Sequence, residues 1–267
     1  MGKDSLKTKT AENVKQGGER DFSQVQVISR AATILRTLRD TGGCNLSDLA
    51  RAVGLPRSTV FRIVKSLEEE RFVTSKGENG NIQLGEGLVS MGAAVNRNLR
   101  EELRPYLESL SQEVGGETID LAILDEDHLL FVDQVTPPNR LRAVSGVGVN
   151  FPLHCTANGK AILSSLSTEE IKRMLPEQLP IFTSNTIPTR SQLITELAQI
   201  RSLGVAIDRE EHTIGICAVG TMVNLPSRKP AVISIPIPTI RFSGKEEKFV
   251  HALLLTRNMI NVRFQPF

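Results

Sequence analysis

The chain has 267 residues, of which 40% are hydrophobic and 23% charged, and its formal net charge is +2. This length favours two domains over one, and the composition is typical of a globular protein. No apolar run is long enough to span a bilayer, and the polar segment from Met1 to Arg20 lacks the apolar core of a signal peptide. Three widely spaced cysteines exclude a disulfide framework and fit a reducing compartment. We therefore expect a cytoplasmic protein with no membrane association.

Residues 23–85 carry the pattern of a helix-turn-helix domain, after a polar tail at residues 1–22 that we expect to be mobile. Apolar residues at helical spacing predict a first helix that begins near Ser29. A second helix is predicted with Ser47 as its N-cap and Gly54 at its end, and a third helix follows closely. Two short helices joined by a tight turn that contains glycine are typical of a helix-turn-helix unit.

The polar face of the third helix is the predicted DNA-reading surface. Arginine can bind guanine through paired hydrogen bonds, and serine and threonine can donate to phosphates or base edges. The turn Glu78–Gly80 between two short extended segments predicts a hairpin that would form the wing. A plain helical bundle with a solvated basic face is the alternative, but the hairpin favours double-stranded operator DNA as the partner. The predicted DNA-binding residues are Arg57, Ser58, Thr59, Arg62 and Lys65.

A helical linker is predicted at residues 86–103, because leucine, methionine and valine recur there at helical spacing. Pro105 should kink or interrupt the helical pattern that continues beyond the linker. Such a linker could carry a rotation from one domain to the other, or it could only cap one of the two cores. The remaining residues, 104–267, form the second domain.

Alternating strand and helix patterns predict an α+β second domain with a mostly antiparallel sheet. Thr168 is the expected N-cap of one helix, whose first turn is acidic. Strands are expected at residues 118–124, 129–135, 141–144, 205–208, 214–223 and 231–237, and helices at 157–166, 168–175, 191–203 and 244–261.

Several motifs resemble those of the IclR family of bacterial regulators, in the same order along nearly the whole chain after the tail. The resemblance implies a winged helix-turn-helix homodimer or homotetramer that acts as a repressor or an activator. It also implies a second domain similar to GAF and PAS sensors, which binds a small-molecule effector, often an organic acid. The matching stretches are Ser29–Ala31, Gly54–Thr59, Leu84–Gly85, Pro152–Ala161 and Asp208–His212 with Gly215.

The resemblance also implies an effector pocket in this chain, whose residues are matched to those of the family position by position. Backbone N–H groups at the start of the helix predicted from residue 157 would suit a carboxylate. Asp208 would accept a hydrogen bond from a ligand hydroxyl or fix its loop. Where better-known members have Cys and a second Ser, this chain has Ala218 and Pro236. We therefore expect a ligand that is larger and less polar, such as an aromatic or aliphatic acid. The alternative is that the pocket has lost its sensing role. The expected effector-binding residues are Phe151, Ala157, Asn158, Asp208, Ala218 and Ser234.

An enzyme or a metal-binding sensor that uses His154, Cys155 and His212 is the alternative function. A cysteine nucleophile needs a base within hydrogen-bond reach, but adjacent residues on an extended chain point to opposite faces. Cys217 lies in an apolar strand, which suits a buried and inert thiol, and no spacing matches a zinc signature. We therefore expect a protein that is not an enzyme and has no metal or cofactor. A pure protein-interaction module is a third interpretation, which the basic winged domain disfavours.

Overall fold

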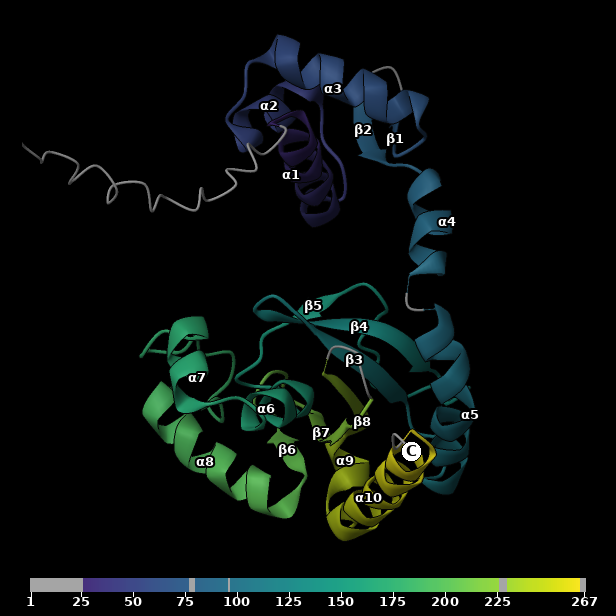
Figure 1. Cartoon of the computed structure of the whole chain (residues 1–267), viewed down its shortest axis with the longest axis vertical. Helices are drawn as coiled ribbons and strands as arrows, with labels where there is room; N and C mark the ends of the chain where they lie inside the picture. The colour runs from purple at the N-terminus through teal and green to yellow at the C-terminus, as the bar shows by residue number, and fades with distance from the viewer. Residues whose placement is uncertain (1–25, 77–79, 96, 226–229, 265–267) are drawn as a thin grey trace, which may run out of the picture. The chain divides into compact units, whose positions relative to one another are not determined.

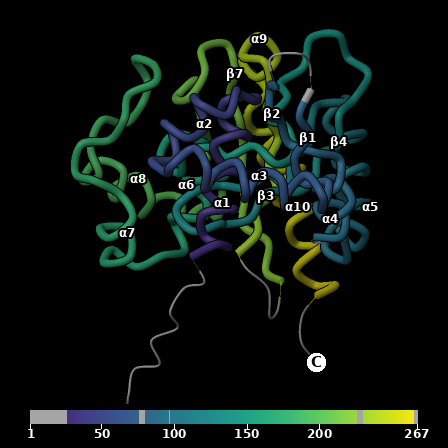
Figure 2. The backbone as a smooth tube through the Cα atoms, turned by 90° about the horizontal axis from the view of Figure 1, so that it is seen from above, coloured from purple at the N-terminus to yellow at the C-terminus, as the bar shows by residue number. Residues whose placement is uncertain are grey.

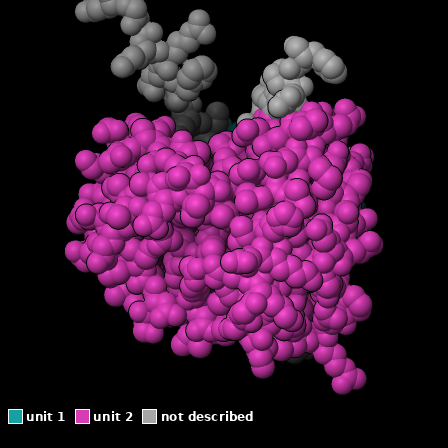
Figure 3. Space-filling model, turned by 90° about the horizontal axis from the view of Figure 1, so that it is seen from below, with its two compact units in different colours: residues 1–95 teal, residues 96–267 magenta. Residues whose placement is uncertain are grey.

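Two compact units with separate hydrophobic cores make up the computed structural model (Figure 1 and Figure 2). They are Met1–Val95 and Asn96–Phe267, and Figure 3 shows one face of the second unit. In the part of the chain that the structure describes, no helix combines the length and the apolarity that crossing a bilayer requires. The described residues are 26–76, 80–95, 97–225 and 230–264.

Helices and a two-stranded hairpin share the core of the first unit, as the sequence predicts. Their apolar stripes meet in a core in which Ile34 and Leu49 are fully buried. The two strands pair antiparallel with Val73 opposite Leu84, and the predicted turn overlaps residues 77–79, which lie outside the described residues. The elements are α1 (Gln26–Thr41), α2 (Leu46–Val53), α3 (Arg57–Glu69), β1 (Val73–Lys76), β2 (Asn81–Leu84) and α4 (Gly87–Ala94).

The N-cap of α2 differs from the prediction. Asn45, not Ser47, caps the helix, because its side-chain oxygen accepts hydrogen bonds from the N–H groups of Ser47 and Asp48, at 3.0 Å each. Asparagine satisfies two donors of the first turn in this way, so the helix begins earlier than the prediction placed it. Gly54 ends α2 as expected, with a φ of 65° that glycine adopts without strain.

Pro105 does not interrupt its helix, although interruption was one of the two effects predicted for it. The break falls instead at Val95, which is extended with φ −69° and ψ 131°, and α5 (Arg97–Glu113) runs through the proline. Pro105 is exposed, whereas Leu103 and Leu107 on either side of it are fully buried in the core of the second unit. Their packing outweighs the backbone hydrogen bond that proline cannot donate.

An antiparallel sheet of six strands, in the order β5-β4-β3-β8-β7-β6, forms the centre of the described second unit and confirms the predicted fold class. Side chains alternate between the two faces of the sheet, so each strand contributes side chains to both faces. On β8, Ile233, Ile235 and Ile237 belong to one buried core, whereas Ser234 and Pro236 between them line a cavity on the other face. The strands are β3 (Ile119–Asp125), β4 (His128–Val135), β5 (Asn150–Phe151), β6 (Ala206–Arg209), β7 (Ile216–Val223) and β8 (Ala231–Pro238).

Helices cover both faces of this sheet (Figure 1 and Figure 2). α5 and α10 pack on one face, around a core that includes Leu107 and Leu253. α6 and α8 pack on the other face, around Ile162 and Leu197, and this second core holds α6 against β7. The helices that follow α5 are α6 (Ala157–Ser164), α7 (Thr168–Met174), α8 (Arg190–Leu203), α9 (Thr239–Phe242) and α10 (Glu246–Arg263).

The strand expected at residues 141–144 is wrong. The edge of the sheet is instead β5, in which Asn150 and Phe151 pair with the start of β4. Gly146 and Gly148 have positive φ values and turn the chain just before β5. The loop of residues 136–149 therefore lies beside the sheet rather than within it.

The N-cap of α7 is Ser167 rather than Thr168. The Ser167 hydroxyl accepts from the Glu170 N–H at 3.3 Å, and the Glu170 carboxylate accepts from the Ser167 N–H at 2.8 Å. This reciprocal arrangement satisfies two backbone donors at once. Thr168 could not form it, because the residue three positions further on is Ile171.

Candidate functional site

The exposed face of α3 carries the side chains predicted to read DNA. Four of the five are exposed, and Thr59 is half-buried. Neither Arg57 nor Arg62 forms an ion pair with any described residue, so both guanidinium groups can pair with an external anion. Lys65 differs, because its ammonium lies 2.8 Å from the Glu68 carboxylate. The uncompensated positive charge of this face therefore comes from Arg57 and Arg62 rather than from Lys65.

Phe61 lies on the same face of α3 and is absent from the predicted set. Its side chain is 49% exposed. Helical spacing places Phe61 four residues after Arg57 and four before Lys65, so the three side chains share one side of the helix. Apolar side chains in the major groove can contact the methyl group of thymine. The available signal was an aromatic residue that falls outside the apolar stripe of its own helix.

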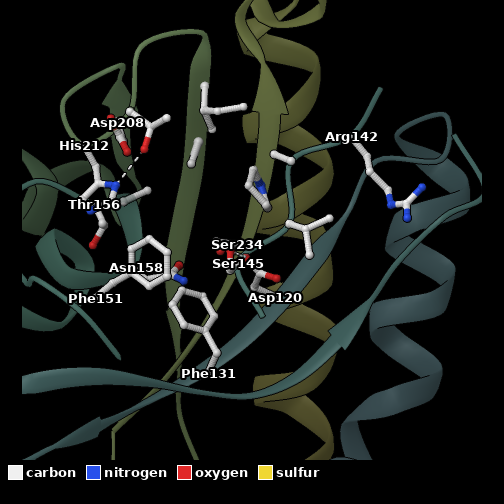
Figure 4. A pocket seen from close by; sticks show the side chains of 17 residues that line it. Asp120, Phe131, Arg142, Ser145, Phe151, Thr156, Asn158, Asp208, His212 and Ser234 are labelled. Atoms are coloured by element: carbon white, nitrogen blue, oxygen red, sulfur yellow. Dashed lines mark hydrogen bonds between the residues drawn. The ribbon is translucent and has the colours of Figure 1, made fainter. Parts of the chain in front are cut away.

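A cavity of about 270 Å³ lies in the second unit, on the face of the sheet that α6 covers. Residues from strands β3 to β8 line it, and residues 142–145 of the loop before β5 lie along one side (Figure 4). β8 pairs with β3 only as far as Ser234, so at Pro236 the strand is locally an edge, where proline is tolerated. All six residues predicted for the effector site line this cavity: Phe151, Ala157, Asn158, Asp208, Ala218 and Ser234.

Two rows of cross-strand neighbours run across the cavity floor. Neighbouring strands lie about 4.8 Å apart, so a row that crosses three strands spans roughly 10 Å between its outer backbones. One row is Asp120 on β3, Ser234 on β8 and Gly220 on β7; the next is Pro236 on β8, Ala218 on β7 and Asp208 on β6.

The first turn of α6 lies over Gly220, and Thr156, Ala157 and Asn158 line the cavity. Thr156 is the N-cap, and its hydroxyl accepts from the Gly159 N–H at 3.1 Å. The N–H groups of Ala157 and Asn158 have no acceptor within the helix, and with the helix dipole they favour a bound anion. The Asn158 side-chain oxygen is buried without a hydrogen-bond partner among the described residues. A ligand or a water that donates to this oxygen would satisfy it.

Two glycines allow α6 to begin in this position. A Cβ at Gly220 would lie 3.0 Å from the Ala157 carbonyl carbon and 3.1 Å from the Asn158 side-chain oxygen. A Cβ at Gly159 would clash with the backbone of Leu153, whose carbonyl oxygen would be 2.1 Å away. The helix start therefore lies close to β7 on one side and to the preceding segment on the other.

A fully buried lysine anchors α6 behind its first turn. Lys160 Nζ donates to Glu196 Oε1 and Glu211 Oε1, at 2.5 Å each, and to the Ile207 carbonyl at 2.7 Å. A buried ammonium without such partners would be strongly destabilising. The two ion pairs tie α6 to α8 and to the loop that follows β6, and the hydrogen bond to Ile207 ties it to β6.

Asp208 fixes the loop that follows β6, which is one of the two roles expected for it. Its carboxylate accepts from the Glu211 N–H at 2.7 Å, and it also interacts with the backbone of His212. Burial raises the pKa of Asp208 from 3.8 to about 7, because desolvation outweighs these hydrogen bonds. The carboxyl group is therefore ionised in only part of the molecules at neutral pH.

Aromatic side chains line one wall of the cavity. The ring centroids of Phe131 and Phe151 are 5.2 Å apart, and that of His212 is 4.9 Å from Phe151. Burial lowers the pKa of His212, so this imidazole is neutral at pH 7 and contributes a polarisable ring rather than a charge. Such a wall suits a flat or apolar ligand body.

Asp120 is a lining residue that sequence reasoning missed. Its Oδ1 accepts from Gln134 Nε2 at 2.6 Å, and its Oδ2 accepts from Ser145 Oγ at 2.5 Å. The residue is 1% exposed, and burial raises its pKa from 3.8 to about 6. The available signal was a single acidic residue in the otherwise apolar segment 119–124, since acidic residues are rarely fully buried unless they are paired.

Arg142 also lines the cavity, but it is not aimed at the group of polar side chains on the floor. Its side chain extends away from Asp120 and Ser234 (Figure 4), and its Nη1 donates to the Asn139 carbonyl at 2.8 Å. The start of α6 is therefore the better candidate for binding an anion inside the cavity.

The residues of the catalytic or metal-binding alternative are not arranged for either chemistry. His154 Nε2 lies 2.8 Å from the Pro180 carbonyl, and the His212 ring packs against Phe151 at an interplanar angle of 52°. Cys155 is fully buried, and burial raises the pKa of its thiol to about 12, so the reactive thiolate does not form at neutral pH. Within the described ranges, no three His, Cys, Asp or Glu side chains gather in a way that could hold a metal ion.

Two family models match the two units of the chain. The IclR helix-turn-helix domain matches residues 27–77, and the bacterial transcriptional regulator IclR C-terminal domain matches residues 91–261. The chain belongs to the IclR family of bacterial transcriptional regulators. This IclR-family regulator is 46% identical over 241 residues to the HTH-type transcriptional regulator Rv1719 of Mycobacterium tuberculosis, a match that covers 90% of this chain and 93% of that protein.

Other relatives of this IclR-family regulator are similar over most of their length. The HTH-type transcriptional regulator TtgV of Pseudomonas putida is 37% identical, with 87% of this chain and 89% of that protein covered. The transcriptional repressor IclR of Escherichia coli is 33% identical, with 82% of each chain covered. These relatives and the family models are regulators of transcription rather than enzymes, which excludes the catalytic alternative.

Solved structures show the same fold. An IclR transcriptional regulator from Alicyclobacillus acidocaldarius superposes with a TM-score of 0.79 and 25% identity, over 91% of this chain and 100% of that one. An IclR homologue from Microbacterium hydrocarbonoxydans, complexed with 4-hydroxybenzoate, superposes with a TM-score of 0.77 and 21% identity, over 89% of this chain and 98% of that one. This IclR-family regulator thus combines a DNA-binding helix-turn-helix domain with an effector-binding C-terminal domain.

Proposed function

We propose that this IclR-family regulator changes its affinity for operator DNA when an organic acid with an apolar body binds in the cavity beside α6. The observation that carries this proposal is the presence of a donor-lined helix start and an aromatic wall in one cavity. Effector binding would shift the protein between states that differ in operator affinity, and the operator must then affect effector binding by the same factor. Repression and activation are both compatible with this coupling.

The carboxylate of the effector would bind at the start of α6. The N–H groups of Ala157 and Asn158 supply donors there, and the helix dipole supplies a favourable potential. The Asn158 side chain lines the cavity beside these donors, and its amide NH2 group could donate to the carboxylate, whereas its buried oxygen can only accept.

The apolar body of the effector would lie against Phe131, Phe151, Ala218 and Pro236. An apolar cavity of about 150 Å³ is large enough to hold benzene, and this cavity of about 270 Å³ has room for a ring and a carboxylate. The binding of 4-hydroxybenzoate by a protein of the same fold supports a ligand of this size. Ala218 and Pro236 offer no side-chain hydrogen bond, which disfavours two- or three-carbon keto acids.

The DNA contacts of the proposal lie on the exposed face of α3. One short recognition helix reads only a few base pairs, so we infer that the protein acts as a homodimer, or a homotetramer, on a site with two-fold symmetry. The proposed contacts to double-stranded operator DNA come from Arg57, Ser58, Thr59, Arg62 and Lys65.

We also propose boundaries for the two functional domains and the linker between them. The DNA-reading domain is assigned to residues 23–85, the helical linker to 86–103 and the effector domain to 104–267. The break between α4 and α5 at Val95 falls inside the proposed linker, where a change in one domain could reach the other. A role on operator DNA fits a cytoplasmic location.

Calorimetry of the full-length protein with benzoate and with hexanoate tests the effector half of this proposal. Asn158→Leu should weaken the binding of both acids by about tenfold or more, because it removes a polar group beside the carboxylate and fills part of the cavity. Asn98→Leu is the matched control, since Asn98 is exposed on α5. Operator affinity, measured by fluorescence anisotropy, should change when the wild-type protein is saturated with the acid.

The proposal fails if Asn158→Leu and Asn98→Leu bind the acids as the wild type does, because the site then lies elsewhere. It also fails if saturation with an acid leaves operator affinity unchanged. Tighter binding of pyruvate than of benzoate would show that the expected preference for a larger, less polar ligand is wrong.

A further inference from the structure

We propose that Asp120 selects effectors that carry a hydroxyl group on the apolar body, so that the effector of this regulator is a hydroxy acid rather than a plain acid. This inference rests on the proposed effector site at the start of α6. Asp120 lines the same cavity, but it belongs to β3, on the side of the floor away from Asp208. None of the sequence motifs points to it.

The surroundings of Asp120 leave part of its acceptor capacity unused. It is 1% exposed and forms no ion pair with a described residue. A carboxylate offers about four lone-pair sites, and among the described residues only Gln134 Nε2 and Ser145 Oγ donate to Asp120, one to each oxygen. A buried carboxylate is costly when it is incompletely hydrogen-bonded, so a further donor from a ligand would be favourable.

Asp208, the other buried carboxyl group of the cavity, is placed differently. Its oxygen accepts from the Glu211 N–H, and its carboxylate holds the loop after β6 in place. Asp120 instead holds two side chains, one of which, Ser145, lies on the loop before β5 and also lines the cavity. A ligand can therefore donate a further hydrogen bond to Asp120 without displacing a contact to the backbone.

The cross-strand row through Ser234 gives the distance that the ligand must bridge. Asp120 and Gly220 are the outer members of this row, roughly 10 Å apart at the backbone by the spacing of strands. The start of α6 lies over Gly220, since a Cβ there would meet Ala157 and Asn158. Figure 4 shows Asp120, Ser145 and Ser234 grouped together, with Phe131 and Asn158 near them and Asp208, Thr156 and His212 in a separate group.

The two ends of this row have opposite hydrogen-bonding character. The α6 end offers N–H donors, which suit a carboxylate, and the Asp120 end offers acceptors, which repel a carboxylate and suit a hydroxyl proton. A ring with the two groups on opposite sides matches both ends at once. A hydroxyl hydrogen-bonded to an ionised carboxylate is also a stronger contact than one between neutral groups.

Matched pairs of acids with and without the hydroxyl test this inference by calorimetry on the full-length protein. The pairs are benzoate with 4-hydroxybenzoate and phenylacetate with 4-hydroxyphenylacetate. The wild type should bind the hydroxylated member of at least one pair about tenfold or more tightly. Asp120→Asn and Asp120→Ala should reduce this preference, measured as the ratio of the two affinities within each variant, to about threefold or less. Asp127→Asn, in the exposed turn after β3, is the control and should keep the preference.

Retained binding of the plain acid shows that the pocket of each variant is folded. Equal binding of both members of each pair by the wild type would overturn the inference, as would a preference that survives in both Asp120 variants. Tighter binding of 4-(aminomethyl)benzoate than of 4-hydroxybenzoate would show that Asp120 binds an ammonium group rather than a hydroxyl, and would also overturn the inference.

If plain acids bind and Asn158→Leu abolishes their binding, the proposed function stands whatever happens at Asp120. If no acid binds at all, both proposals fail.

Discussion

The face of α3 and the cavity beside α6 are candidate recognition surfaces of opposite construction. On α3, the candidate contacts come from one short helix, and the guanidinium groups of Arg57 and Arg62 are exposed and form no ion pair with described residues. In the cavity, Asp120 and Ser234 are neighbours across the sheet although they are far apart in the chain. Polar groups there are already desolvated before any ligand arrives.

This difference predicts how folding and binding depend on each surface. An exposed arginine contributes little to folding, and its partner is supplied by the DNA. A buried polar group must be satisfied in the folded protein itself, so its removal affects folding as well as ligand binding. Substitutions on α3 should therefore change affinity alone, whereas substitutions around the cavity should change both.

The largest expected effect on stability comes from Lys160→Met. It would leave the carboxylates of Glu196 and Glu211 without their buried cation, which should lower the free energy of unfolding by about 3–5 kcal/mol. Urea unfolding of the effector domain, followed by circular dichroism, measures this loss. Lys172→Met, on the exposed side of α7, is the control and should stay within about 0.5 kcal/mol of the wild type. An equal effect of the two substitutions would contradict the comparison.

Asp208→Asn should change the pH dependence of stability. Because burial raises the pKa of Asp208 in the folded state from 3.8 to about 7, the stability associated with its protonated form is lost as the pH rises through 7. A change of one in pKa corresponds to about 1.4 kcal/mol, so the loss between pH 4 and 8 is on the order of 2–4 kcal/mol. Asparagine can still accept from the Glu211 N–H and does not titrate.

Thermal melting of the wild type and the Asp208→Asn variant between pH 5 and 8 measures this difference. The melting temperature of the wild type should fall relative to that of the variant as the pH rises, and the variant should be the more stable protein at pH 8. Melting curves that shift in parallel over this range would show that Asp208 is ionised throughout.

Arg57→Ala should reduce operator affinity without changing stability. Loss of a base-reading arginine should cost about 1–3 kcal/mol and relax specificity at one position of the operator. Lys65→Ala should have a smaller effect, because Lys65 is paired with Glu68, and should weaken all DNA sequences alike while flattening the salt dependence. Fluorescence anisotropy on specific and random duplexes at several salt concentrations distinguishes the loss of a base contact from the loss of a phosphate contact. Normal operator binding by Arg57→Ala would mean that another surface reads the DNA.

Phe61→Ala should have the smallest of these effects, about 1 kcal/mol, if its ring packs on a thymine methyl group. Replacing single thymines in the operator by deoxyuridine removes only that methyl group. The wild type should then lose affinity at one or two positions, and Phe61→Ala should be indifferent to the same replacements. A Phe61→Ala protein that remains as sensitive as the wild type would show that the exposed ring has another role.

Local patterns predicted the first unit well because its elements are short and consecutive. Helical spacing, the glycine at position 54 and the polar face of α3 are all visible within a few residues of sequence, and the structure confirms the helices they predict. Errors arose where a nearby residue competed for the same role or tertiary packing decided the outcome. Asn45, two residues before Ser47, caps α2, and the packing of buried Leu103 and Leu107 carried α5 through Pro105.

The cavity shows the limit of sequence reasoning more clearly. The six residues expected from the family resemblance all line it, but Asp120 was missed because its place beside Ser234 depends on the order of strands in the sheet. The partners of Lys160 were likewise hidden, since they come from α8 and from the loop after β6. A short motif identifies residues near it in the chain, whereas the far side of a pocket is assembled from distant strands.

The alternation of side chains along β8 has a consequence for how such sensors diversify. Ile233, Ile235 and Ile237 hold the sheet to α5 and α10, and Ser234 and Pro236 face the cavity between them. In the proposed effector site, a mutation at a cavity-facing codon would therefore alter the chemical that the protein detects, while the neighbouring codons would continue to specify the same folded domain. Duplicated genes can in this way acquire new inducers by single substitutions at every second position of one strand.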